Sequence, residues 1–327
     1  MKREIKYKMV IVAGFGGSGS SAVIDLLREF DTFKDLGLEF RLLVDPDGIL
    51  NLEDNLINNW TPFQSDMAIK RFKELINKLS NKNKFPYFRT DLTRKLGKEF
   101  VSLSDEYINN LISFSYKGMW IGINDPKWWI CRKFREKFGI KFLNYCKPIH
   151  ISFKKEQFIN ITKNYLKGLF ESNINDKKIK YIILDEGYAS LNPSRVLKYF
   201  EYSKMIIVHR DPRDIFIGAL KNEFHFIPHE IEAFINWYEC LQKQTRTYID
   251  ENDKILRINF EDLVLKYDKT LKKILQFLSM YNYSHTNKKK YFNPNISIKN
   301  IGIYKNYKNQ HEIELIYNHL KEYCYIQ

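Results

Sequence analysis

The residues best suited to chemistry in this sequence form a glycine-serine loop near the N-terminus. Residues 14–21 read Gly-Phe-Gly-Gly-Ser-Gly-Ser-Ser, between an apolar run at 9–13 and a segment of helical spacing at 20–30. Glycines let the backbone curl so that several N–H groups point to one centre, and the helix N-terminus adds partial positive charge. We therefore predict a phosphate-binding loop with contacts from Gly16, Gly17, Ser18, Gly19, Ser20 and Ser21.

This loop has no lysine. The spacing of Gly14, Gly19 and Ser21 matches the frame of the nucleotide P-loop, but Ser20 stands where that motif has its lysine. Nucleotide hydrolases use the lysine on the outer phosphates, so its absence argues against ATP hydrolysis. The alternative is a tight strand-to-helix turn whose glycines serve packing alone.

A second candidate motif lies far downstream, at 205–214, and reads Met-Ile-Ile-Val-His-Arg-Asp-Pro-Arg-Asp. An apolar strand there runs into a helix that begins at the proline. Arg210 would then emerge at the carboxyl end of the strand, where its guanidinium could hold a phosphate with two hydrogen bonds. The alternative is a structural ion-pair cluster, in which Arg210 and Arg213 pair with Asp211 and Asp214.

The elements around these motifs predict an α/β fold of three layers with a central parallel sheet. The predicted strands are 9–13, 39–44, 181–184, 205–208 and 255–258, and the predicted helices are 20–30, 67–79, 156–170, 193–199, 212–222, 231–248 and 263–278. Alternating strands and helices favour a parallel sheet, in which ligands bind at the carboxyl ends of the strands. We expect a single domain over 1–327, with 45–175 as a helical, aromatic-rich insertion that covers the nucleotide site and shapes a pocket for a second substrate.

Together these features resemble the sulfotransferase family, in its P-loop-like fold and as a divergent bacterial type. The glycine-serine loop and the Arg-Asp-Pro-Arg-Asp motif carry the resemblance, supported by Ile-Leu-Arg-Ile-Asn-Phe-Glu-Asp-Leu at 255–263 and Asn-Ile-Gly-Ile-Tyr-Lys at 300–305. The resemblance covers residues 8–30 and 180–325. It implies transfer of a sulfuryl group from 3′-phosphoadenosine-5′-phosphosulfate to a hydroxyl or amine of a glycan or other acceptor.

The resemblance also assigns roles to residues. The loop, Gly16–Ser21, would hold the 5′-phosphosulfate, Arg210 the 3′-phosphate, and Gly302 would lie in a segment that closes over the nucleotide. No metal is implied. This sequence departs from the family at Gly17, where a lysine or arginine is usual, at Gly218, where a serine is usual, and at Ala22, where an aromatic residue stacks on adenine. Candidate substitutes for the missing loop cation are Arg41, Lys70 and Arg71.

A general base must accept the proton of the acceptor group. We expect Glu186 in this role, with Asp185 next, because both follow a strand that ends at the same edge of the sheet. Other family members use a glutamate after the second strand, which would indicate Glu39, Asp45 or Asp47. A surface or helix-N-terminal carboxylate is the structural alternative for Glu186.

The composition of the chain limits which classes of molecule it is expected to bind. The formal net charge of +14 favours an anionic partner such as a nucleotide. No nucleic-acid recognition motif is present, and no apolar stretch is long enough to span a membrane. His225 and His229 are separated by Pro228, which argues against a helical metal pair. The cysteines are isolated and no signal peptide is evident, so we expect a cytoplasmic protein.

Two other functions stay open at this stage. One is a transferase of the same fold that moves another group, such as phosphoryl, from a different nucleotide. The other is a non-catalytic protein that binds a nucleotide or polyanion, favoured by the loss of the basic loop residue at Gly17.

Overall fold

A computed structural model describes residues 7–80, 92–120, 133, 137, 146–171, 176–247, 253–281 and 284–326 of the chain. Its contacts divide the chain into two compact units. The first contains residues 1–41 and 174–327, and the second contains residues 42–173. Within the described ranges, every helix is too short or too polar to cross a lipid bilayer.

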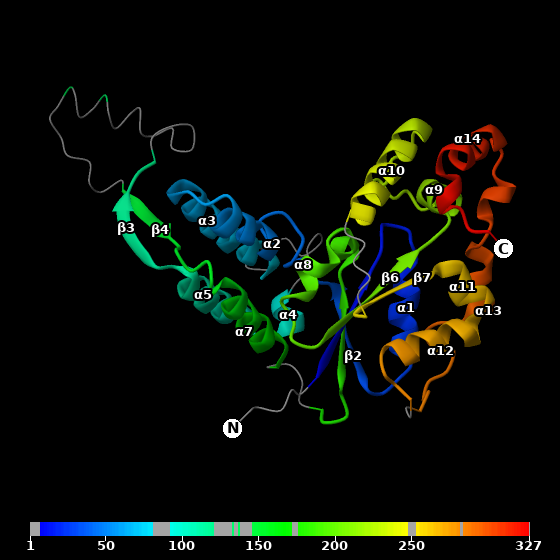
Figure 1. Cartoon of the computed structure of the whole chain (residues 1–327), viewed down its shortest axis with the longest axis horizontal. Coiled ribbons are helices and arrows are strands. Elements are labelled where there is room, and N and C mark those ends of the chain that lie inside the picture. Colours follow the sequence, from blue (N-terminus) through cyan, green and yellow to red (C-terminus); the bar gives the residue numbers. More distant parts are fainter. Residues whose placement is uncertain are drawn as a thin grey trace. The chain divides into compact units, whose positions relative to one another are not determined.

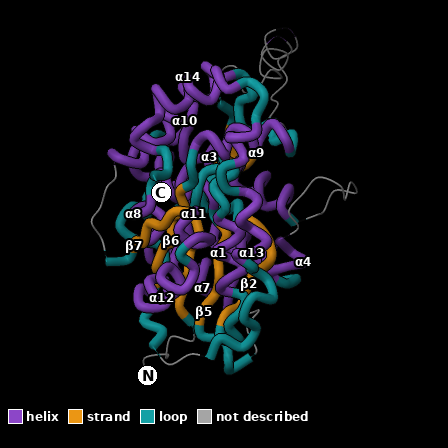
Figure 2. Tube along the Cα trace, turned by 90° about the vertical axis from the view of Figure 1, so that its right-hand side faces the viewer, coloured by secondary structure: helices purple, strands orange, loops and turns teal. Residues whose placement is uncertain are grey.

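A five-stranded sheet forms the centre of the first unit (Figures 1 and 2). Its strands run in the order β2-β5-β1-β6-β7, and all neighbours are parallel. The strands are β1 (Lys8–Ala13), β2 (Phe33–Glu39), β5 (Tyr181–Asp185), β6 (Ser203–His209) and β7 (Ile255–Asn259). The α/β class with a parallel sheet is therefore confirmed, and the carboxyl ends of all five strands lie at one edge.

Helices follow the strands in the alternation that parallel pairing requires. The helices of this unit are α1 (Ser20–Leu27), η3 (Gly187–Leu191), α8 (Pro193–Leu197), α9 (Pro212–Lys221), α10 (Ile231–Thr247), α11 (Phe260–Leu265), α12 (Tyr267–Phe277), α13 (Pro294–Ser297), η4 (Ile298–Asn300), η5 (Ile303–Asn306), α14 (Gln310–Leu320) and η6 (Lys321–Tyr323).

The core lies on the face of the sheet covered by α1, α11 and α12. Val10 and Val12 of β1 and Val208 of β6 pack there against these helices. Figure 1 shows α1 and α12 beside one face of the strands and α8 beside the other. Since parallel crossovers are right-handed, α1 and the helices between β5, β6 and β7 belong on opposite faces.

The second unit is mainly helical. It contains α2 (Ile49–Glu53), η1 (Asp54–Asn58), α3 (Pro62–Leu79), α4 (Leu92–Leu96), α5 (Phe100–Leu111), α7 (Phe158–Glu171) and an antiparallel pair, β3 (Phe114–Gly118) with β4 (Lys147–Ile151). The hydroxyls of Tyr107 and Thr162 hydrogen bond at 2.9 Å, and the ring of Tyr107 stacks on Tyr165 at 4.3 Å. These buried contacts join α5 to α7.

Two expectations about elements are wrong. The sequence predicts a strand at 39–44, but the observed strand, β2, lies earlier in the chain and ends at Glu39. Phe40, Leu42 and Leu43 are buried in the turns that follow it. The apolar residues of this run therefore indicate a buried segment and not a β-strand. The single helix predicted at 263–278 is two helices, because the backbone leaves the helical region at Lys266 (φ −123°, ψ 45°).

Candidate functional site

The glycine-serine loop has a backbone shape that only glycine adopts easily. Gly17 and Gly19 lie in the left-handed region, with φ of 78° and 85°, where a side chain is strained. A Cβ atom on Gly19 would also lie 2.6 Å from the ring of Phe260, which is buried. Two left-handed residues within three positions curl the backbone of the loop.

The amides of this loop have few partners inside the protein. Ser18 donates to the carbonyl of Phe15 at 2.9 Å, and Gly14 to that of Gly187 at 3.0 Å. The N–H groups of Gly16, Gly17, Gly19, Ser20 and Ser21 have no acceptor in the described part of the chain. The hydroxyl of Ser18 is also buried there without a partner. A cluster of donors of this kind at a helix N-terminus is suited to a phosphate.

Arg210 reaches the same loop. Its Nη1 donates to the carbonyl of Gly17 at 3.0 Å, and its Nη2 donates to that of Asn300 at 2.6 Å. The guanidinium lies 5.0 Å from the ring centre of Phe260, and its Nε is buried with no partner in the described residues. The structure thus places Arg210 on the loop side of the sheet, between two segments that are distant in sequence.

The ion-pair alternative describes the other arginine of the motif. Arg213 binds Asp211 through Nη2 at 2.6 Å and Nε at 3.0 Å, while Asp211 also caps α9 by accepting the amide of Arg213. Asp214 accepts the amides of Gly302 at 2.7 Å and Tyr304 at 3.3 Å. Asp211 and Asp214 thus have other partners, and neither forms an ion pair with Arg210 in the described part of the chain. The guanidinium of Arg210 therefore stays available for a ligand.

The segment that contains Gly302 is fixed beside Arg210 by α9. Gly302 has a φ of 68°, so this turn too requires the left-handed region. The aliphatic stem of Lys305 folds over Gly302, with Cε 3.4 Å from the position of a Cβ atom there. Sequence reasoning missed the role of Asp214, although an acidic residue in the first turn of α9 was visible.

The candidate bases differ in exposure. Glu186 is only 1% exposed, whereas Asp185 is partly exposed and Glu39 is exposed. Asp185 and Glu39 are partners in the β5–β2 ladder. A Cβ atom on Gly187 would lie 3.4 Å from the carbonyl of Gly14 and 3.6 Å from Glu39 Oε1. Glu39 therefore lies near the start of the loop, and Asp185 is its partner on the neighbouring strand.

Burial and the neighbouring carboxylates shift the pKa of Asp185. Burial makes the larger contribution, and the charges of Glu39 and Asp35 add to it, so that the pKa rises to about 6. A carboxylate with a pKa near neutrality is a better proton acceptor than an ordinary aspartate. Glu39 is also within 3.7 Å of Arg41 Nη1.

The positions where the sequence departs from the family have distinct surroundings. No atom lies within 4 Å of a Cβ atom placed on Gly218, so the space beside α9 is open. Ala22 packs against the core under α1. Lys70, Arg71, Asp45 and Asp47 belong to the second unit, where Lys70 pairs with Asp66 at 2.6 Å. Among the described residues no three His, Cys, Asp or Glu side chains are grouped as metal ligands.

A known family profile matches part of this chain. Residues 154–283 match the profile described as "Sulfotransferase family". The match includes Asp185, Glu186 and Arg210, begins after the glycine-serine loop and ends before Gly302. It confirms the resemblance that the sequence motifs indicated. No curated protein sequence matches the chain.

Several solved sulfotransferases show weak structural similarity. STF9 from Mycobacterium avium is 12% identical over 98% of this chain and 76% of its own, with a TM-score of 0.42. The sulfotransferase domain of the Synechococcus PCC 7002 olefin synthase is 11% identical over 97% of both chains, with a TM-score of 0.42. That of the curacin biosynthetic pathway is 14% identical over 97% of this chain and 98% of its own, at 0.41.

Proposed function

We propose that this chain, whose residues 154–283 match the sulfotransferase family profile, transfers a sulfuryl group from 3′-phosphoadenosine-5′-phosphosulfate to an acceptor hydroxyl or amine. A saccharide is one acceptor class that fits the proposal. The observation that carries it is the contact of Arg210 with the glycine-serine loop, at 3.0 Å from the carbonyl of Gly17. That contact brings a guanidinium and a cluster of free amides to one place.

The residues present suit a doubly phosphorylated nucleotide. The free amides of Gly16, Gly17, Gly19, Ser20 and Ser21, together with the hydroxyl of Ser18, which has no partner among the described residues, would bind the 5′-phosphosulfate. Arg210 would bind the 3′-phosphate, exchanging its present carbonyl partners for charged oxygens, which form stronger hydrogen bonds with a guanidinium. Gly302 would line the nucleotide from the opposite segment, held there by Asp214.

A cation from another segment must replace the basic residue that the family carries at the position of Gly17. Lys305 is a cation of the same unit, and its side chain folds over Gly302. With Arg210 on the 3′-phosphate, we assign to Lys305 the charge neutralisation that Gly17 cannot provide. Positioning and fixed charge supply most of the catalysis in reactions of this class, so a displaced cation still contributes if it lies close to the leaving phosphate.

Asp185 is our choice of general base, with Glu39 as the neighbour that raises its pKa. Its carboxylate would take the proton of the acceptor as the new oxygen–sulfur bond forms and the sulfur–oxygen bond to the donor phosphate breaks. Glu186, the first expectation, faces the protein interior at 1% exposure. It stays a second proposal, to be separated from Asp185 by mutation.

Turnover tests this function. Purified protein is incubated with sulfur-labelled donor and a panel of acceptors with hydroxyl, amine and saccharide groups, and transfer of label is measured. We expect label in at least one acceptor class, and its loss in Arg210→Ala. Arg28→Ala is the matched control, since Arg28 is exposed and pairs with Asp25. Label transfer unaffected by Arg210→Ala would refute the assigned site.

A non-catalytic nucleotide-binding protein is the second candidate, and Gly17 is the observation that favours it. Tight binding of adenosine 3′,5′-bisphosphate without any label transfer over the whole acceptor panel would support this candidate. Binding of ATP in preference to the bisphosphate would instead support transfer of a phosphoryl group.

A further inference from the structure

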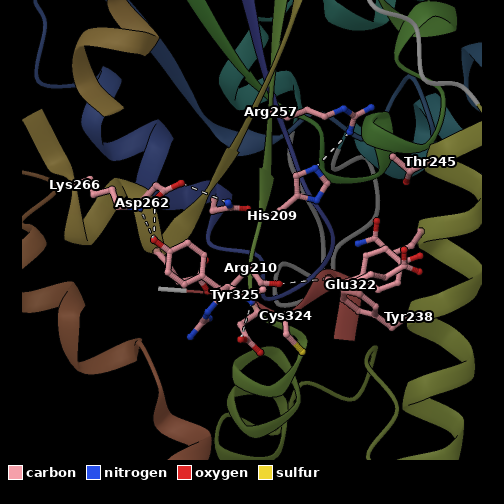
Figure 3. A pocket seen from close by; sticks show the side chains of 16 residues that line it. His209, Arg210, Tyr238, Thr245, Arg257, Asp262, Lys266, Glu322, Cys324 and Tyr325 are labelled. Carbon is pink, nitrogen blue, oxygen red and sulfur yellow. Dashed lines mark hydrogen bonds and ion pairs between the residues drawn. The ribbon is translucent and has the colours of Figure 1, made fainter. Parts of the chain in front are cut away.

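A cavity of about 530 Å³ lies beside the carboxyl ends of β6 and β7 in the first unit (Figure 3). His209 and Arg257 line it from the two strands, Tyr238 and Thr245 from α10, and Tyr325 from the C-terminal segment. Its volume lies in the range of small-molecule sites in proteins. The nucleotide site proposed above does not use this cavity.

The strand side chains His209 and Arg257, which line the cavity, lie on the face of the sheet opposite α1, and α11 lines the cavity at the carboxyl edge. Leu256 and Ile258 of β7 pack into the core beneath α1, α11 and α12. Successive side chains of a strand point to opposite faces, so Arg257 between them points to the other side. Arg210 contributes its backbone there, where its carbonyl accepts the hydroxyl of Tyr238 at 3.4 Å, while its side chain contacts Gly17.

Arg257 is a half-buried cation without an acidic partner in the described residues. Its single side-chain hydrogen bond there joins Nη1 to His209 Nε2 at 3.4 Å (Figure 3). Burial and the charge of Arg257 lower the pKa of His209 to about 4, so the histidine is neutral at pH 7 and accepts this bond. A guanidinium has five N–H donors, and most of those of Arg257 stay available for a ligand.

The acidic side chains in the cavity wall are largely compensated. Asp211 pairs with Arg213 at 2.6 Å. Asp262 pairs with Lys266 at 2.8 Å and accepts the hydroxyl of Tyr325 at 2.8 Å. Because these two carboxylates already have cationic partners, they do not neutralise the charge of Arg257.

Two further carboxylates line the wall. Glu261 accepts the amide of Asp211 at 2.9 Å, and burial raises its pKa to about 7, which reduces its negative charge near neutral pH. Glu322 is exposed on the C-terminal segment. Among the described residues that line the cavity, Arg257 is thus a cation that forms no ion pair with a carboxylate.

We propose that this cavity binds a small hydroxylated molecule with one oxyanion group, a phosphate or a carboxylate, held by Arg257. A planar guanidinium matches two oxygens of either group. Gln242, Thr245 and Asn259 line the remaining wall and provide amide and hydroxyl groups for the polar body of the ligand. This site is separate from the donor site and does not depend on the transfer reaction.

Calorimetric titration of the full-length protein tests the proposal. The probes are inorganic phosphate, glucose 6-phosphate and citrate, which separate phosphate from carboxylate and a bare ion from a hydroxylated ligand. We expect at least one organic probe to bind, and Arg257→Gln to weaken it about tenfold to a hundredfold, the usual effect of losing charged hydrogen bonds. Arg257→Lys, which keeps the charge but loses the planar fork, should weaken it less.

The variant Arg210→Ala distinguishes the two sites. Probe binding should survive in it, while Arg257→Gln should keep the wild-type affinity for adenosine 3′,5′-bisphosphate, which also shows that this variant is folded. The proposal is overturned if no probe binds the wild type, if Arg257→Gln binds the probe unchanged, or if Arg210→Ala abolishes probe binding. Preference for inorganic phosphate alone would overturn the organic-ligand part of the proposal.

Discussion

Asp185 should set the lower pH limit of the proposed transfer reaction. It must be deprotonated to accept a proton, and its pKa is raised to about 6. We therefore expect kcat/KM to increase with pH up to a plateau above pH 7, with a midpoint near 6. Asp185→Asn should remove this limb and reduce kcat by about 10²–10⁴-fold. The charged form is penalised by burial, so the amide should not weaken the fold.

The neighbour of Asp185 provides the sign test. Glu39→Gln removes a nearby negative charge, which lowers the pKa of Asp185 and should move the midpoint of the pH profile to lower pH. Glu186→Gln is the comparison variant. If Glu186→Gln loses turnover with bisphosphate binding intact, while Asp185→Asn stays active, the base is Glu186 and our choice is wrong.

Gly218 allows a gain of function to be tested. The space beside it is open, so Gly218→Ser places a hydroxyl on α9, the helix that follows Arg210, without a clash. If the nucleotide's 3′-phosphate binds there, the new hydrogen bond should tighten bisphosphate binding by up to about 1.5 kcal/mol. Gly218→Ala is the matched control: it should stabilise α9 by about 0.5–1 kcal/mol and leave affinity unchanged. Equal affinities of the two variants for the bisphosphate would show that the 3′-phosphate does not bind beside Gly218.

At the scale of elements, the shape of the glycine-serine loop depends on Gly19. Gly19→Ala should destabilise the protein by about 1–3 kcal/mol, because φ is 85° and the methyl group would meet the buried ring of Phe260. Gly16→Ala is the control, since its φ is not positive and its methyl group would meet only the exposed, movable ring of Phe226. Chemical denaturation measures both. Equal destabilisation would mean that the loop is not held by these constraints.

Asp214 should hold the segment around Gly302 in place. It accepts two amides of that segment, so Asp214→Ala should release them. We expect faster hydrogen exchange at the amides of Gly302 and Tyr304, together with weaker bisphosphate binding. Exchange rates that do not change would show that the segment is positioned by its other contacts, such as Tyr304 against Arg213.

Sequence patterns predicted elements where burial and spacing agreed. The strands at β1, β5, β6 and β7 and the helices α9 and α10 follow from apolar runs and from Pro212 at a helix start. The strand at 39–44 was misplaced, because its apolar residues are buried in turns rather than in a ladder. The polar alternation of β2, interrupted by Gly37 at φ 65°, gave no clear strand signal.

The site was predictable only in part for a similar reason. Local signals pointed to the loop and to Arg210, since glycines and a proline-marked helix start are visible in sequence. The contacts that join them arise from tertiary structure: Asn300 with Arg210, Asp214 with Gly302, and Phe260 with Gly19. Arg257 is also hidden in sequence, because its lack of an acidic partner depends on what lies across the strands.

At the scale of the whole molecule, the proposed donor site belongs entirely to the unit formed by residues 1–41 and 174–327. Arg210 joins its two sequence-distant halves, through Gly17 on one side and Asn300 on the other. The net charge of +14 suits a highly anionic nucleotide and predicts weaker binding at high ionic strength.

The most direct test of this picture is titration of the wild type and Arg210→Ala with adenosine 3′,5′-bisphosphate, with ATP as the competitor. We expect tight binding to the wild type, little effect of ATP, and a loss of about 1–3 kcal/mol in Arg210→Ala. Equal affinity of the two proteins for the bisphosphate, or no binding to the wild type, would contradict it.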